Sequence, residues 1–288
     1  MKFNSKYFFA ALIIFLVEVA IATLFKSVSF VRAYLGDILV VILIYCFIRA
    51  FFHIKNTKKL LQKKYRKDSY LIEGWHLFEE AVQAQAEFRN IFVLEEFVDR
   101  VQDFPQVHVV TADILADLAD SKTPQGIVAE IAFEEATIPA VLKGKYLFLE
   151  DVQDPGNVGT IIRTADAAGY DGVFISQHSA DIYNLKTLRS MQGSHFHLPV
   201  YRVKTADFLE LAKQVQLPIL ATTLSKDSMD YRELAPLSDF ALVLGNEGQG
   251  ISHEMAEAAD NLIHISMKGR AESLNVAVAA GILIFALS

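Results

Sequence analysis

The sequence predicts an α/β protein whose larger, C-terminal part contains a mainly parallel sheet. Two observations predict this fold class. Short apolar runs of strand length alternate with helical segments from about residue 56 to the C-terminus, and polar, glycine-containing turns follow three of these runs. Alternation of this kind favours parallel strands with a ligand site at their carboxyl ends. The length of 288 residues is enough for two modest domains and an additional segment.

The first segment, residues 1–55, carries most of the apolar excess of the chain. Residues 7–25 form a nearly unbroken apolar run, long enough to cross a bilayer core of about 30 Å as a helix. A second run, 38–54, is interrupted by Arg49, whose long side chain can reach the membrane interface. No small-residue cleavage site follows the first run, and the second comes soon after it. We therefore expect a two-helix membrane hairpin and not a signal peptide.

The basic residues around the two apolar runs predict the orientation of this hairpin. Lys2 and Lys6 precede the first run, and seven Lys or Arg lie in residues 55–67 without any acid. The positive-inside rule then places both ends in the cytoplasm. The stretch "VRAYLGDILVVILIYCFIRAFF" also resembles the start of a family of small bacterial membrane proteins. We expect the remaining domains to be cytoplasmic and anchored to the cytoplasmic membrane through residues 7–54. The single cysteine, Cys46, excludes an internal disulfide.

The second segment, residues 56–135, is predicted to form a small α/β domain. Apolar residues at helical spacing after "SYLIEG" indicate a helix, and "ADILADLAD" indicates another. Strands are predicted at "YLIEG", "NIFVLEE", "VHVVT" and "QGIVAEIAF". The stretch "ATIPAVLKGK", 136–145, is the expected boundary with the third segment, residues 136–288.

The third segment is predicted to contain strands at "YLFLED", "GVFIS", "ILATTL" and "FALVLGNE", with a further strand that ends at Ile265. The turn after the first of these strands reads "NVGTIIRTA". Asn157 and Gly159 are expected in the turn, and Arg163 on the helix that follows. Asn157 alone could be an ordinary helix N-cap. Arg163, six residues later, lies too far into the helix to cap it.

The second turn, "LVLGNEGQGIS", contains three glycines that allow the backbone to approach a ligand closely. Glu247 lies between them, where it can accept hydrogen bonds from amides or orient an arginine. The third turn follows the last strand, and in it Ser273 and Asn275 precede a strongly apolar helix. Ser273 is well placed to cap this helix. A second polar residue two positions later indicates more than capping.

These three strings, in this order, resemble the motifs of the SpoU (TrmH-type) family of RNA ribose 2′-O-methyltransferases of the SPOUT superfamily. The resemblance covers about the last half of the chain, and "LRSMQGSHFHLPVY" also fits it. "KKYRKDSYLIEGWHLFEEA" and "TPQGIVAE" are similar to the substrate-binding domain that often precedes this catalytic domain. One departure is visible in the third motif, where Ser266 replaces the usual proline.

The resemblance implies a C-terminal trefoil-knot methyltransferase domain whose loops hold S-adenosylmethionine in a bent conformation. It also implies a homodimer with the RNA site at or near the interface. The residues expected to contact the cofactor are Thr223, Gly245, Ile265, Met267 and Leu274.

The residues expected to carry the reaction are Arg163, Asn157, Glu247, Ser273 and Asn275. By this resemblance Arg163 is the base for the ribose hydroxyl, although an arginine normally keeps its proton. The alternative is that Arg163 binds the adjacent phosphate and stabilises the forming alkoxide as a fixed cation. The sequence leaves both roles open. No metal is expected, because no cysteine–histidine cluster has zinc spacing.

The RNA is expected to be ribosomal because an additional N-terminal domain precedes the catalytic domain. The basic run 55–67 provides a surface for RNA on a chain whose net charge is −7, or flanks the membrane span, or does both. Two alternatives are a tRNA 2′-O-methyltransferase and a membrane-anchored RNA-binding module without activity. A Rossmann-type enzyme would need G-x-G-x-x-G after its first strand, and "DPGNVGT" does not match that pattern.

Overall fold

The computed structural model describes residue 13 and residues 68–288, except 122 and 135. The described domains belong to one compact unit that spans residues 64–288. The predicted membrane hairpin, 7–54, lies outside the described residues apart from Ile13. Among the residues that are described, no helix is both long and apolar enough to cross a membrane.

The smaller domain is built on a four-stranded mixed sheet with strand order β1-β4-β2-β3. Strand β4 pairs antiparallel with both neighbours, and β2 pairs parallel with β3. The predicted strands and helices of this domain are confirmed. The elements are β1 (Ser69–Glu73), α4 (Trp75–Gln83), β2 (Phe88–Val93), η2 (Glu95–Arg100), β3 (Val107–Val109), α5 (Ala112–Leu118) and β4 (Ile127–Ala132).

The core of the smaller domain forms between this sheet and helix α4. Residues 127–131 of β4 are all buried, and those at 127, 129 and 131 cluster with Leu77, Phe78 and Ala81 of the helix. Alternation with period two places one set of side chains on one face of a strand. The spacing of the buried helix residues gives α4 a single apolar stripe that faces the sheet.

The larger domain contains a seven-stranded sheet with strand order β7-β6-β5-β10-β8-β11-β9. All six strand pairs are parallel, as predicted. The inner strands are buried on both faces and therefore read as continuous apolar runs. The strands are β5 (Lys145–Leu149), β6 (Gly172–Ser176), β7 (Val200–Val203), β8 (Ile219–Thr222), β9 (Met229–Asp230), β10 (Phe240–Leu244) and β11 (Asn261–His264).

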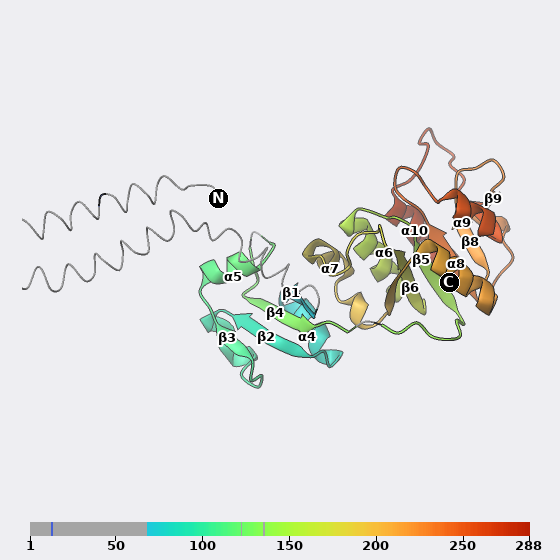
Figure 1. Cartoon of the computed structure of the whole chain (residues 1–288). Coiled ribbons are helices and arrows are strands. Elements are labelled where there is room, and N and C mark those ends of the chain that lie inside the picture. Colours follow the sequence, from blue (N-terminus) through green and yellow to red (C-terminus); the bar gives the residue numbers. More distant parts are fainter. Residues whose placement is uncertain (1–12, 14–67, 122, 135) are drawn as a thin grey trace, which may run out of the picture. The chain divides into compact units, whose positions relative to one another are not determined.

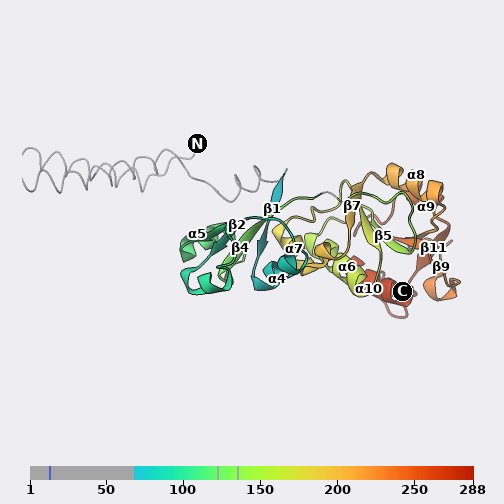
Figure 2. The same ribbon diagram turned by 90° about the horizontal axis from the view of Figure 1, so that it is seen from below.

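Helices cover both faces of this sheet, so the domain has three layers (Figures 1 and 2). Strand residues Leu147 and Leu149 face α6 (Pro155–Ala167), α7 (Leu185–Met191) and α10 (Val276–Ala286). The intervening Phe148 faces α8 (Thr205–Val215) and α9 (His253–Ala258), and it stacks on Phe208 of α8. Two short 3-10 helices, η3 (Ser194–Phe196) and η4 (Tyr231–Glu233), complete the domain.

The strand order brings four carboxyl ends together that are far apart in the sequence. Strand β5 lies between β6 and β10, and β10 lies between β5 and β8, with β11 on the far side of β8. The sequence did not predict β7 or β9, the two edge strands, which have four and two residues. The last predicted strand ends at His264, one residue before the expected Ile265.

Candidate active site

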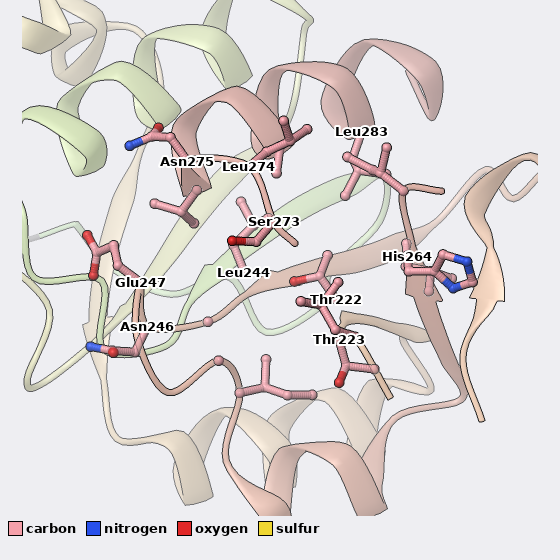
Figure 3. A pocket seen from close by; sticks show the side chains of 18 of the residues that line it. Thr222, Thr223, Leu244, Asn246, Glu247, His264, Ser273, Leu274, Asn275 and Leu283 are labelled. Carbon is pink, nitrogen blue, oxygen red and sulfur yellow. The ribbon is translucent and has the colours of Figure 1, made fainter. Parts of the chain in front are cut away.

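A cavity of about 500 Å³ opens at the carboxyl ends of β8, β10 and β11. The first turns of α10 form its remaining wall, and Figure 3 shows side chains from all these elements around one space. This volume lies in the range typical of small-molecule sites. The lining residues are 222–225, 244–251, 263–265, 267, 273–276, 279 and 283.

The structure brings together most residues that the sequence singled out. The five residues expected to contact a cofactor all line the cavity, namely Thr223, Gly245, Ile265, Met267 and Leu274. Three of the five residues expected to carry a reaction also line it, namely Glu247, Ser273 and Asn275. Asn157 lies beside them, as described below, and Arg163 is outside the lining.

One wall of the cavity is a tight loop that we call the glycine loop, residues 245–250. Asn246 and Gly250 exchange two backbone hydrogen bonds of 2.9 Å, which close the loop. Gly245 permits this closure, because a Cβ there would lie 2.3 Å from the carbonyl carbon of Gly250. Gly250 itself has a φ of 73°, which favours glycine. The glycines leave part of this wall as bare backbone, and the side chains of Asn246, Glu247 and Gln249 line the cavity beside it.

A chain of hydrogen bonds joins three separate loops at one end of the cavity. The Asn275 side-chain amide donates to Asn157 Oδ1 at 3.1 Å, and the Asn157 side-chain amide donates to Glu247 Oε1 at 3.0 Å. Glu247 also accepts from the backbone amides of Gln153 and Asp154, each at 3.1 Å. These bonds hold the turn that leads into α6, which we call the α6 turn (residues 151–157), against the glycine loop.

The helix N-terminus beside each asparagine sets the direction of these bonds. Asn275 Oδ1 accepts from the backbone amides of Ala277 and Val278, so Asn275 is the N-cap of α10. Its amide nitrogen is thereby directed at Asn157. The sequence analysis was wrong to expect Ser273 in this capping position, because the helix begins later and Ser273 lies in the loop before the cap.

The N-cap of α6 is Asp154, and Asn157 lies in the first helical turn. Asp154 Oδ1 accepts from the amides of Gly156 and Asn157, at 2.7 and 3.0 Å. This leaves the Asn157 side chain free to bond with Glu247 and Asn275. A hydrogen bond from the Lys186 side chain lowers the pKa of Asp154, and the hydrogen bond from the backbone amide of Asn157 acts in the same direction. Asp154 therefore remains a charged cap at neutral pH.

The environment of Glu247 makes this carboxylate a poor proton acceptor. Burial raises its pKa, but the hydrogen bonds from the Asn157 side chain and the backbone amides outweigh this effect, so its pKa lies below the ordinary value. Three N–H donors already occupy its two oxygens. Glu247 is thus suited to positioning its neighbours and not to removing a proton.

Arg163 is exposed on α6, and its side chain makes no hydrogen bond or ion pair with the residues that the structure describes. Six helical residues separate it from Asn157, which corresponds to about 9 Å along the axis and about 120° of rotation. Arg163 therefore points away from the face that carries Asn157. Its guanidinium remains available for a group that approaches from outside the chain.

At the opposite end of the cavity, His264 belongs to a second polar network (Figure 3). Ser228 and Ser266 hydroxyls lie 3.0 and 3.3 Å from the two ring nitrogens of His264. Hydrogen bonds from Arg232 and then from Ser266 lower the pKa of Asp230, which is almost buried. Ser266, which stands where related motifs have proline, therefore ties the loop after β11 to β9.

The sequence analysis did not single out Asn246, Asp154 or His264. The N-cap pattern of an aspartate directly before proline, in "DPGN", was the available signal for Asp154. No local signal distinguishes Asn246 or His264, because their roles depend on neighbours that are distant in sequence. Among the described residues, no group of three or more His, Cys, Asp or Glu side chains could hold a metal ion.

Comparisons with known proteins agree with this geometry. Residues 144–285 match the SpoU rRNA methylase family, and residues 52–129 match the MRM3-like substrate-binding domain. A curated relative is the 23S rRNA (guanosine(2553)-2′-O)-methyltransferase RlmP of Bacillus subtilis, 39% identical over 238 residues, which cover 81% of this chain and 95% of RlmP.

Solved structures give the same result. The AdoMet-bound rRNA methyltransferase of Sinorhizobium meliloti superposes with a TM-score of 0.71 at 32% identity, over 80% of this chain and 89% of that chain. The SpoU methyltransferase AviRb of Streptomyces viridochromogenes, in complex with AdoMet, has a TM-score of 0.68 at 27% identity, over 78% and 91% of the two chains. The chain has the SPOUT methyltransferase fold and belongs to the SpoU rRNA methylase family.

Proposed function

We propose that this protein is an S-adenosylmethionine-dependent methyltransferase that modifies a ribose 2′-hydroxyl in 23S ribosomal RNA. The observation that carries the proposal is the hydrogen-bonded convergence of Asn157, Glu247 and Asn275 beside a cavity of cofactor size. The match to RlmP over most of both chains supports ribosomal RNA as the substrate.

The cavity fits S-adenosylmethionine in size and in chemistry. The walls at Leu244, Ile265 and Leu283 are apolar. The glycine loop adds backbone and the polar side chains of Asn246, Glu247 and Gln249 to the lining, which suits a flat ligand with polar edges. Thr223 lies toward the His264 end of the space (Figure 3). When bound, the cofactor supplies an electrophilic methyl group on a sulfonium. We assign Thr223, Gly245, Ile265, Met267 and Leu274 to its binding.

The residues around Asn157 are suited to hold a ribose and its phosphate. Asn275 and Asp154 are the N-caps of α10 and α6, so two helix N-termini meet at the Asn157–Asn275 contact. The positive ends of helix dipoles favour an anion at such a point. We assign Asn157, Glu247, Ser273 and Asn275 to positioning the substrate, and Arg163 to the hydroxyl or the adjacent phosphate.

The charge distribution supports a proposal for where the RNA backbone binds. Residues 68–135 contain 15 Asp or Glu and three Lys or Arg, so this part of the small domain does not attract phosphate as a whole. The preceding run 55–67 contains seven basic residues and no acid. We propose that residues 1–55, 56–135 and 136–288 are the membrane segment, the RNA substrate-binding domain and the knotted methyltransferase domain. The basic run would provide much of the salt-dependent attraction.

Helix α10 supports the expected homodimer. One side of this helix lines the cavity through Ala279 and Leu283, whereas Val278, Ile282 and Phe285 are exposed by 52%, 37% and 57%. Their spacing places these three side chains on one face. An exposed apolar stripe on an otherwise apolar helix is typical of a protein interface. Pairing of two copies there would place the site of each near the other copy.

We expect Phe285→Glu to convert a dimer into a monomer, because a charge on each copy would face an apolar surface and its own counterpart. Sedimentation velocity of the wild type and the variant measures this change directly. Val141→Glu, at a side chain that is 62% exposed elsewhere, is the matched control and should remain dimeric. A wild type that sediments as a monomer at micromolar concentration would contradict the homodimer.

The membrane anchor is a separate proposal that rests on the apolar runs within residues 7–54. We expect the full chain to stay in the membrane pellet after carbonate extraction, and a chain without residues 1–54 to be released. Release of the full chain by carbonate would remove the anchor from the proposal and leave the methyltransferase assignment unchanged.

The experiment that tests the proposed function is a map of ribose methylation in total RNA. A strain that lacks the gene should lose one 2′-O-methyl group in 23S rRNA, and the purified chain with S-adenosylmethionine should restore it on RNA from that strain. A loss confined to tRNA would support the tRNA alternative. Unchanged methylation, together with absent S-adenosylhomocysteine binding in calorimetry, would support an inactive RNA-binding module.

A further inference from the structure

The α6 turn begins with a residue in an unusual backbone conformation. Asp151 lies two residues after the end of β5 and has a φ of 58°, a left-handed value that costs free energy for a residue with a side chain. Such a conformation persists only where neighbours hold it. Asp151 has two such neighbours, Ser176 and Asn246, and they come from different parts of the chain.

Ser176 holds the side-chain end of Asp151. The Ser176 hydroxyl donates to Asp151 Oδ1 at 2.6 Å and accepts from the Asp151 backbone amide at 2.9 Å. Ser176 ends β6 and is only 2% exposed, so it is a fixed part of the sheet. This contact anchors the start of the α6 turn to the rigid part of the domain.

Asn246 holds the carbonyl end of Asp151. Its side-chain amide nitrogen donates to the Asp151 carbonyl at 2.8 Å. Its side-chain oxygen accepts from the backbone amides of Gly248 and Gln249, at 2.9 and 3.0 Å. One side chain therefore fixes the shape of the glycine loop with its oxygen and binds the α6 turn with its nitrogen.

We propose that Asn246 is a positioning residue that couples occupancy of the cofactor cavity to the geometry of the α6 turn. The whole glycine loop lines the cavity, so a ligand there favours the loop shape that the Asn246 oxygen maintains. The Asn246 nitrogen then keeps the Asp151 carbonyl in place. The bonds from Gln153 and Asp154 to the neighbouring Glu247 strengthen in the same arrangement, and with them the position of Asn157.

This inference rests on the proposed function for the identity of the ligand, and it extends that function from residue assignment to coupling. Coupling of two sites is reciprocal, so ordering of the α6 turn by RNA would also favour cofactor binding. Glu247 alone does not provide this link, because its bonds reach the turn, its own backbone amide and Asn157, but not the amides of Gly248 and Gln249.

The discriminating variant is Asn246→Asp. An aspartate keeps the oxygen that accepts from Gly248 and Gln249, but it has no N–H to donate to the Asp151 carbonyl. The glycine loop should therefore fold, whereas the bridge to the α6 turn is lost. Ser252→Asp is the matched control, because it adds the same charge beside the loop at an exposed N-cap where aspartate also caps.

The measurement is hydrogen–deuterium exchange of the full chain with and without S-adenosylhomocysteine, beside calorimetry of its binding. In the wild type and in Ser252→Asp, the ligand should slow exchange of amides 152–157 by about tenfold, within the usual range of coupling. In Asn246→Asp, the ligand should still bind and should slow exchange of the glycine loop, but amides 152–157 should change by less than about twofold.

Turnover provides the second readout. Asn246→Asp should lower kcat with saturating cofactor by about tenfold and change the cofactor KM much less, because the cavity remains intact. Wild-type protection of amides 152–157 in Asn246→Asp, or a loss confined to cofactor KM, would overturn the inference.

If Asn246→Asp does not fold, Ser176→Ala tests the other support of Asp151 and should give the same loss of protection. Failure of the wild type to bind S-adenosylhomocysteine would refute the proposed function, and binding without protection would refute only the coupling.

Discussion

Arg163→Ala should lower kcat by on the order of 10³-fold and leave the affinity for S-adenosylhomocysteine unchanged within about twofold. The guanidinium is outside the lining of the cavity and has no partner among the described residues, so its removal costs little in folding or cofactor binding. It is, however, the free cation that this part of α6 offers to a hydroxyl or phosphate. Single-turnover kinetics and calorimetry measure the two quantities separately.

Lys213→Ala, at another exposed cation of the same domain, is the control and should keep the wild-type rate. Wild-type turnover in Arg163→Ala would remove Arg163 from the mechanism. Arg163→Lys distinguishes the two roles that remain open. A lysine base should act faster as pH rises toward about 10, where lysine loses its proton, whereas a lysine that acts only as a fixed cation should lose activity there.

Gly245→Ala should weaken S-adenosylhomocysteine binding by on the order of 100-fold, a loss of about 3 kcal/mol. The added methyl group would lie 2.3 Å from the carbonyl carbon of Gly250, and backbone on both sides of the glycine loop would have to separate. The loop would then lose the shape that encloses the cavity. Calorimetry gives the affinity, and circular dichroism shows whether the rest of the domain remains folded.

The control for this change is Gly269→Ala, in the loop that precedes α10. A Cβ at Gly269 would meet no atom within 4 Å, and Gly269 does not line the cavity. Its affinity should therefore equal that of the wild type within about twofold. Equal binding by Gly245→Ala and Gly269→Ala would show that the glycine loop is not part of the cofactor site.

The sequence predicted the sheets well because their strands are buried in a recognisable way. The inner strands of the larger sheet are apolar on both faces, so "YLFLED" and "FALVLGNE" stand out without any knowledge of their neighbours. The cofactor residues were expected because the turns after those strands resemble the SpoU motifs, and all five of them line the cavity. Their convergence on one cavity follows from parallel strand direction, which the α/β alternation already implied.

What the sequence could not predict depends on contacts between distant segments. Asn246 and Ser176 hold Asp151 from 95 and 25 residues away, and no local pattern announces such a contact. The helix caps were misplaced for a related reason. Ser273 and Asn275 can both cap in isolation, and the tertiary bond from Asn275 to Asn157 favours the later start. The direction of Arg163 became clear only once α6 had a defined first residue.

The position of β10 also has a consequence for synthesis on the ribosome. This strand is made after β8 but lies between β5 and β8, so a nascent chain that ends before residue 240 lacks the element that joins them. Until then, β5 and β8 each present an unpaired edge, which favours association with other chains. Because β11 and α10 come later still, a truncated translation product contains the α6 turn without the pocket beside it. Such a product would lack most of the residues that we assign to cofactor binding, and also Glu247 and Asn275, which hold Asn157.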